Sequence, residues 1–179
     1  MARLLCDSLA GCDSLTLVMK KLTTLLAIGL AAAAVSLPAQ QLSTKKALNL
    51  DVAKVIAAAA EKEVMKNNWA MFITVIDDGG TVLFLERVND AQIGSYEVSM
   101  EKAQTALRFR RPSKAFEDLA NSGRPALIKL PGALPIEGGL PLMADGKVIG
   151  AIGVSGGASN QDAQAAQAGV AALESLLKK

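Results

Sequence analysis

A G-x-S-x-G segment, Gly153-Val154-Ser155-Gly156-Gly157, is the most recognisable catalytic pattern in the sequence. In hydrolases this turn presents a serine nucleophile, and a histidine takes its proton. The chain contains no histidine. The sequence therefore excludes an ordinary Ser-His-Asp hydrolase, and we predict instead a strand that ends in a glycine-rich turn before the last helix.

Positively charged side chains form a second group that could bind a ligand. Arg108, Arg110 and Arg111 follow Lys102 at a distance of one or two helical turns. Guanidinium groups bind carboxylates in two-pronged geometry, so this cluster predicts a site for an acidic ligand. The alternative is a solvated helix end, where positive charge is favoured without a ligand. The backbone N–H groups of residues 155–159, just before a predicted helix, offer another anion site.

The chain has few side chains that could bind a metal ion or react as a thiol. Both cysteines, Cys6 and Cys12, lie close to the N-terminus, and a zinc site without histidine or cysteine is not expected. Four aspartates are scattered along the sequence, and turn formation or helix capping explains them better than a metal cage does: Asp77, Asp78, Asp90 and Asp162.

The N-terminal segment has the pattern of a secretory signal peptide over residues 19–39. Met19-Lys20-Lys21 is a positive start, Leu22 to Val35 is an apolar run, and Ser36 to Ala39 is a small-residue cleavage region. The apolar run is shorter than the ~20 residues that a membrane-spanning helix needs. We expect cleavage after Ala39, with Ser36 as second choice, and a periplasmic or secreted protein without stable membrane insertion after processing.

Residues 1–18 precede this positive start, and we interpret them as an upstream extension. They include Leu9-Ala10-Gly11-Cys12, which has the form of a lipobox. Only eight residues come before this motif and they include Asp7, so the apolar core that a lipoprotein signal requires is missing. Cys6 and Cys12 would be removed with the signal peptide.

The predicted mature part, residues 40–179, has the length of a single domain. It keeps 16 basic and 15 acidic residues, so its net charge is close to zero. This balance predicts no nucleic-acid partner. It predicts no charge-driven attraction to an anionic membrane either. Without thiols or histidine, the domain must be stabilised by packing and must act through a shaped cavity and its charged groups.

The elements that would position these residues follow from periodicity and turn signals. An amphipathic helix is predicted over residues 45–67, and further helices over 94–109, 113–120 and 160–177. Two hairpins are predicted, over 70–86 around Asp77-Asp78-Gly79-Gly80 and over 140–155 around Asp145-Gly146, with an irregular loop over 123–139. The fold class is therefore α/β (α+β), an antiparallel sheet of two hairpins covered by helices, as in profilin-like and PAS-like sandwiches.

Local signals refine these elements. Pro112 is expected to stop the helix over 94–109, Ser113 to cap the short helix over 113–120, and Ser159 with Asp162 to begin the last one. Gly150 and Gly153 interrupt a predicted strand, where glycine weakens packing unless another backbone or a ligand approaches closely.

Several segments together resemble a known family. They are Val75 to Gly80, Arg87 to Ala91, Lys102 to Ala106, Phe109 to Ser113, Leu130 to Ile136 and Gly150 to Gly156. In this order and spacing they resemble the GlcG/HbpS family of haem-binding proteins, which is related to the C-terminal domain of PduO-type cobalamin adenosyltransferases. The likeness covers residues 45–178. It departs from the usual family pattern at Ala163 and at Val88-Asn89.

The resemblance implies a profilin-like sandwich, assembly into dimers or larger homo-oligomers, and haem or a related tetrapyrrole as cofactor in some members. Some members are described as haem-degrading, and others accompany glycolate or diol metabolism. Since histidine and thiolate are missing, the candidate axial iron ligands are Tyr96, Met100, Lys102 and Thr105. Arg108, Arg110 and Arg111 would pair with propionates, and Phe109 would pack on the macrocycle. For Met100 and Phe109 the alternative is an ordinary core position.

We therefore predict an exported oligomer that binds haem or another small anionic ligand. The first alternative is a cofactor-free enzyme, or enzyme accessory, acting on a small hydroxy- or oxo-acid whose carboxylate is held by Lys102 and Arg110. The second is a ligand-sensing interaction module for a cell-surface sensor.

Overall fold

The computed structural model describes residues 42–178, and those from Thr44 onward belong to one compact unit. The predicted extension 1–18, the signal peptide 19–39, Cys6 and Cys12 lie outside the described residues. None of the helices in the described part has the length and hydropathy needed to cross a bilayer.

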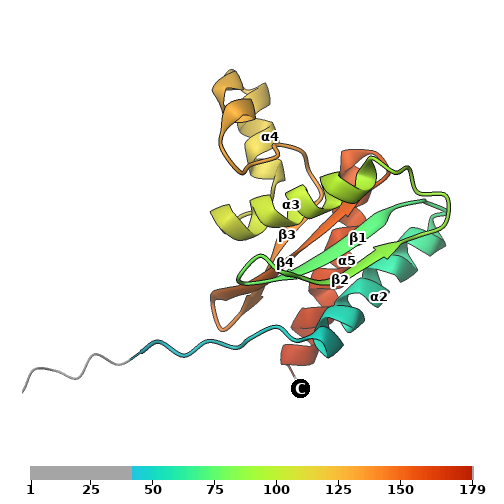
Figure 1. Cartoon of the computed structure of the whole chain (residues 1–179), viewed down its shortest axis with the longest axis vertical. Coiled ribbons are helices and arrows are strands. Elements are labelled where there is room, and N and C mark those ends of the chain that lie inside the picture. Colours follow the sequence, from blue (N-terminus) through green and yellow to red (C-terminus); the bar gives the residue numbers. More distant parts are fainter. Residues whose placement is uncertain (1–41, 179) are drawn as a thin grey trace, which may run out of the picture. The chain divides into compact units, whose positions relative to one another are not determined.

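The sheet has four antiparallel strands, built from two hairpins as predicted. Strands β1 (Phe72–Asp77) and β2 (Val82–Arg87) form the first hairpin, and β3 (Gly139–Ala144) and β4 (Lys147–Ser155) form the second. The two hairpins join through β1 and β4, which gives the strand order β2-β1-β4-β3 (Figure 1). Residues far apart in the sequence therefore become neighbours at the centre of the sheet.

Helices cover both faces of this sheet. Helices α2 (Leu50–Lys66) and α5 (Ser159–Leu177) lie side by side on one face, and α3 (Ser95–Phe109) lies on the other (Figure 1). Helix α4 (Lys114–Asn121) and the 3₁₀-helix η1 (Pro125–Lys129) form an excursion beyond α3. The predicted antiparallel sheet covered by helices is confirmed.

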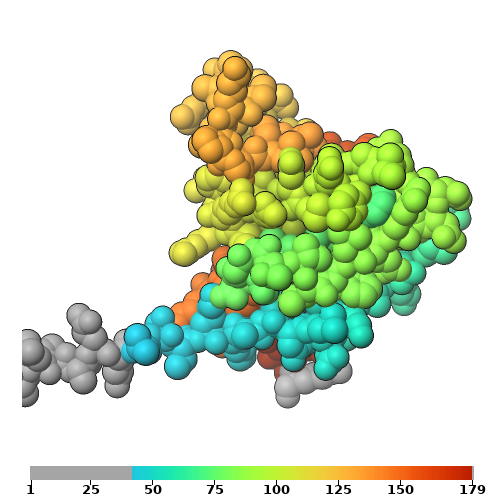
Figure 2. All heavy atoms as spheres, viewed as in Figure 1, coloured from blue at the N-terminus to red at the C-terminus, as the bar shows by residue number. Residues whose placement is uncertain are grey.

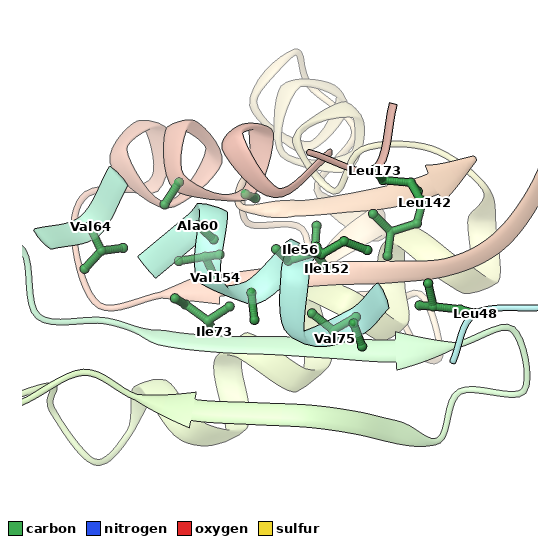
Figure 3. Packing of buried hydrophobic residues seen from close by; sticks show 14 of the residues in the cluster. Leu48, Ile56, Ala60, Val64, Ile73, Val75, Leu142, Ile152, Val154 and Leu173 are labelled. Carbon is green, nitrogen blue, oxygen red and sulfur yellow. The ribbon is translucent and has the colours of Figure 1, made fainter. Parts of the chain in front are cut away.

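The face under α2 and α5 holds the larger hydrophobic core. Ile73 and Val75 of β1 alternate with residues that face α3, as the two-residue period of a strand requires. They meet aliphatic side chains of the helices and of the neighbouring strands (Figure 3), among them Ile56, Val64, Leu142, Ile152, Val154 and Leu173.

The face under α3 is packed with small residues instead. A Cβ atom on Gly153 would lie 2.0 Å from the backbone oxygen of Ser99, and one on Gly139 would lie 2.1 Å from that of Lys102. The helix backbone therefore rests directly on β3 and β4. A Cβ atom on Gly150 would lie 2.4 Å from the oxygen of Ile76. The expectation that Gly150 and Gly153 admit a close backbone is confirmed.

Two helix starts differ from the prediction, and one helix end has a different cause. The side chain of Asn49 accepts a hydrogen bond from Val52 N, so α2 begins at Leu50 rather than near 45. Helix α3 ends at Phe109 as predicted, but because Arg110 adopts a left-handed conformation with φ of 53°, before Pro112 is reached. Ala158, and not Ser159, precedes α5, where Gln161 accepts from Ala158 N.

Candidate functional site

Helix α3 and the residues just beyond it carry every predicted site residue, and the structure divides them among three places. Tyr96 and Met100 lie on the outer face of the first two turns, while Lys102 and Thr105 are buried against the sheet. The third set lies at the C-terminal end of the helix and comprises Arg108, Phe109, Arg110 and Arg111. Figure 2 shows the outer surface of α3 open to solvent beside the segment that follows η1.

Tyr96 and Arg87 both contact the ring of Phe72, Tyr96 through an aromatic contact and Arg87 through a cation–π contact. The Tyr96 side chain is 43% exposed, and its ring meets the ring of Phe72 edge-on with a centroid distance of 5.9 Å. The guanidinium of Arg87 lies over the same Phe72 ring, 5.7 Å from the ring centroid. Sequence reasoning missed Arg87 and Phe72, because their meeting depends on the pairing of β1 with β2, where the two residues are opposite each other.

Arg87 is held in place by its own turn. Its Nε and Nη2 atoms donate to the backbone oxygen of Ala91 at 3.1 and 2.6 Å. Because the guanidinium has five N–H donors, others stay available for a ligand. Met100 is half-buried one turn after Tyr96, and Ile93 just before the helix is 81% exposed. Together these residues form an open platform that is apolar with a positive edge.

Lys102 has a different role from the one predicted, because it is only 1% exposed. Its Nζ donates to Asp162 Oδ2 at 2.6 Å and to the backbone oxygen of Val154 at 3.2 Å. The pair ties α3 to the start of α5 and the end of β4. A Cβ atom on Gly138 would lie 2.9 Å from this Nζ, so the backbone closes over the pair.

Asp162 was predicted as a helix cap, and its main partner is Lys102. Burial raises the pKa of the Asp162 carboxyl, while the Lys102 ammonium and the backbone N–H groups of Gly157 and Gly156 act against this rise. The bond from Gly157 N to Asp162 Oδ1 is 3.0 Å long. Periodicity could not reveal the pair, because the two residues are sixty positions apart.

The turn before α5 was an alternative anion site, and its N–H groups are used internally. Gly157 donates to Asp162, and Ala158 donates to Gln161 Oε1 at 3.0 Å. The Asp162 carboxylate therefore occupies the place in this turn that was considered for a bound anion. Asp77 agrees with its predicted turn role, since its Oδ1 accepts from the N–H groups of Gly79 and Thr81.

Thr105 is fully buried, and its hydroxyl both donates and accepts a hydrogen bond within the protein. It donates to the backbone oxygen of Glu101 at 2.7 Å and accepts from Leu134 N at 2.8 Å. The assignment of Lys102 and Thr105 to a ligand surface therefore disagrees with their burial: both bind the protein itself. Within residues 42–178 every buried side-chain nitrogen and oxygen has a hydrogen-bond partner.

The arginines at the end of α3 point to separate neighbours. Arg108 Nη1 lies 3.4 Å from the oxygen of Gly132, and the Arg111 guanidinium lies 5.7 Å from the ring centroid of Phe116. Phe109 packs against the same ring at 4.9 Å, which fits its alternative as a core residue. Twelve residues of helix separate Tyr96 from Arg108, or roughly 18 Å. The arginines are therefore remote from the Tyr96 platform.

A small pocket lies between α3 and the segment after η1, with a volume of about 180 Å³. Its walls are Glu101, Gln104, Thr105, Arg108, Gly132, Ala133 and Leu134. Within residues 42–178 no group of three or more carboxylates is placed to hold a metal ion.

Comparisons with known proteins all point to one family. The family model described as "Haem degrading protein HbpS-like" matches residues 48–171. Protein GlcG of Escherichia coli K12 is 46% identical over 115 residues, which cover 64% of this chain and 85% of GlcG.

Solved structures agree with this match. The crystal structure of HbpS has a TM-score of 0.67 at 31% identity, covering 76% of this chain and 97% of HbpS. The crystal structure of a PduOC:haem complex has a TM-score of 0.65 at 27% identity, covering 71% of this chain and 95% of PduOC. The chain therefore belongs to the HbpS-like family, as the sequence motifs indicated.

Proposed function

We propose that this chain is an exported protein that binds haem, or a related tetrapyrrole, on the platform around Tyr96. The observation that carries this proposal is the PduOC:haem complex, whose protein shares this fold over 71% of the chain. The family description, which names haem degradation, supports the same ligand class. The platform is the part of this chain whose chemistry suits such a ligand.

The residues of the platform fit a haem in three respects. Tyrosine and methionine both serve as axial ligands of haem iron, and Tyr96 is the exposed one of the two here. Ile93 and the exposed part of the Tyr96 ring offer apolar surface to a flat ring, and the buried Phe72 supports Tyr96 from below. Arg87 lies at the edge with free N–H donors for a propionate. These features favour Tyr96 as the iron ligand and Arg87 as the propionate partner, in place of the remote arginines.

An open platform covers one face of a macrocycle, so the proposal includes a homo-oligomer that covers the other. Large apolar side chains on the surface support such an assembly, among them Val82 at 40% and Ile128 at 63% exposure. Strands β2 and β3 are the two edges of the sheet and have unpaired backbone groups within the described chain.

Haem titration of the cofactor-free protein tests the proposal. We expect a saturable shift of the Soret band, lost or strongly displaced in Tyr96→Phe and weakened in Met100→Ala. Met143→Ala is the matched control, since Met143 is a 41% exposed methionine on β3 and should leave the titration unchanged. Saturable binding of equal affinity in Tyr96→Phe would exclude Tyr96 as the ligand, and the absence of any Soret shift would refute haem binding.

Export to the periplasm or the medium is supported by the sequence pattern of residues 19–39. We expect N-terminal sequencing of the protein from its native compartment to begin at Gln40. A start at Met1 in that material would contradict processing.

The enzyme alternative, in which Lys102 and Arg110 hold a small acid, is not favoured. Lys102 is neutralised by Asp162 inside the domain, while Arg110 is exposed at the end of α3. The two charges are not brought together. The sensor-module alternative stays a prediction.

A further inference from the structure

We propose that the pocket beside the second half of α3 binds a free amino acid, at a site separate from the haem platform. On α3 the pocket is lined by residues between Glu101 and Arg108, which follow Tyr96 and Met100, and no residue is shared between the two sites. The inference does not depend on haem binding.

The pocket is a built feature, because the loop that closes it is tied to the helix at two points. Thr105 accepts a hydrogen bond from Leu134 N at 2.8 Å, and Arg108 Nη1 contacts the oxygen of Gly132. A Cβ atom on Gly132 would lie 2.4 Å from that Nη1, and the residue has a φ of 73°. Glycine at this position therefore allows Arg108 to form the pocket wall.

The charges of the pocket select a dipolar ligand. Glu101 and Arg108 both line it, and neither forms an ion pair with any residue in the range 42–178. Seven residues of helix separate them, or roughly 10 Å, with the amide of Gln104 in between. A simple anion would be repelled by Glu101, and a simple cation by Arg108. A molecule with both charges satisfies both residues.

Each charge has a defined chemical partner in such a ligand. The guanidinium of Arg108 keeps donors free for the carboxylate, which it can bind with two parallel N–H groups. The Glu101 carboxylate would accept from the ammonium group, and Gln104 can both donate and accept between them. The volume of about 180 Å³ is below that of drug-sized sites, which fits a molecule of amino-acid size.

Isothermal titration of the haem-free full chain tests this site with defined probes. The probes are the common amino acids together with γ-aminobutyrate, and the single-charge controls are acetate and methylammonium. We expect saturable binding of at least one zwitterion, with both single-charge probes at least tenfold weaker. Tighter binding of an α-amino acid would indicate that the side chains of Glu101 and Arg108 lean toward the centre of the pocket. Tighter binding of γ-aminobutyrate would indicate that the site holds an extended ligand.

Variants locate the ligand. Arg108→Gln and Glu101→Gln should each weaken binding at least tenfold, and Arg110→Gln is the control, since Arg110 is an exposed arginine outside the pocket. All three positions are on the surface, so the fold should be kept. The proposal is overturned if no amino acid binds, if acetate binds as tightly as the zwitterion, or if Glu101→Gln leaves the affinity unchanged. Loss of haem binding in Tyr96→Phe would leave these results unaffected, so the two proposals fail separately.

Discussion

The two faces of the sheet are packed by different means. On the side of α2 and α5, branched aliphatic side chains pack against one another in the larger hydrophobic core (Figure 3). On the side of α3, the buried cluster is limited to Ile76, Ala103, Ala106 and Ala151, next to polar contacts such as the 2.7 Å hydrogen bond between Thr74 and Ser99. Aliphatic packing is non-directional, whereas hydrogen bonds and close backbone contacts allow one position only. We infer that the first face supplies stability and the second sets the position of α3.

This difference matters for function, because the outer face of α3 carries the groups of both proposed sites. The helix is held by glycines below it and by the ion pair at its middle. Its outer side chains are therefore presented at fixed places along the sheet. Breaking contacts on the α3 face should disturb ligand binding and stability together, while changes in the aliphatic core should affect stability alone.

The largest effect is expected from Lys102→Met, which leaves the Asp162 carboxylate buried without its cation. Removing one partner of a buried pair destabilises a protein by about 3–5 kcal/mol. Urea unfolding at neutral pH measures this loss. The double variant Lys102→Met with Asp162→Asn removes both charges and should recover most of it. Equal stability of the single variant and the parent would show that the pair is not closed to water.

The pH dependence of Lys102→Met sharpens the same test. Without the ammonium, the folded-state pKa of Asp162 should rise further above its value in the unfolded chain. A raised folded-state pKa gives stability that is present below the unfolded-state pKa and lost as the pH rises through the folded-state pKa. The deficit of the variant should therefore be largest at neutral pH and shrink on acidification toward about pH 4. A deficit that grows with acid would contradict the pairing.

A second, smaller effect is expected from Gly153→Ala, which forces α3 away from β4. The new Cβ atom would lie 2.0 Å from the oxygen of Ser99 and 2.6 Å from Ala103 N, and neither backbone atom can turn aside. Overpacking costs about 1–3 kcal/mol, and a backbone clash belongs to the upper end. Gly94→Ala is the control, because nothing lies within 4 Å of its Cβ position and its φ is −60°. Thermal unfolding and the haem titration should both change in Gly153→Ala only.

The smallest effect is expected from Ile73→Val in the aliphatic core. One buried methyl group is lost, which costs about 0.5–1.5 kcal/mol. Because the packing on this face does not set the position of α3, the haem and amino acid affinities should stay the same. Weaker binding in Ile73→Val, measured at a temperature where the variant is fully folded, would remove the distinction between the two faces.

Much of the fold could be predicted because its signals are local. The Asp77 to Gly80 run and Asp145-Gly146 each define a hairpin turn, and helical periodicity follows from side chains three or four residues apart. The order of the strands could not be read in this way, since β1 and β4 are far apart in the sequence. The helix ends also needed the structure, because Asn49 starts α2 through a side-chain hydrogen bond and Arg110 ends α3 through its left-handed backbone conformation.

The sequence assigned the candidate site residues to helix α3 or its C-terminal end, but it could not tell which face of that helix each residue occupies. From residue types alone, the sequence determined that the described domain has no imidazole and no thiol and that α3 concentrates the polar and aromatic candidates. The tertiary structure decided which of them a ligand can reach. Lys102 is turned inward by a carboxylate sixty residues away, while Tyr96 of α3 meets Phe72 of β1, whose ring also lies under the guanidinium of Arg87. These contacts depend on chain pairings between distant residues, and no local pattern encodes them.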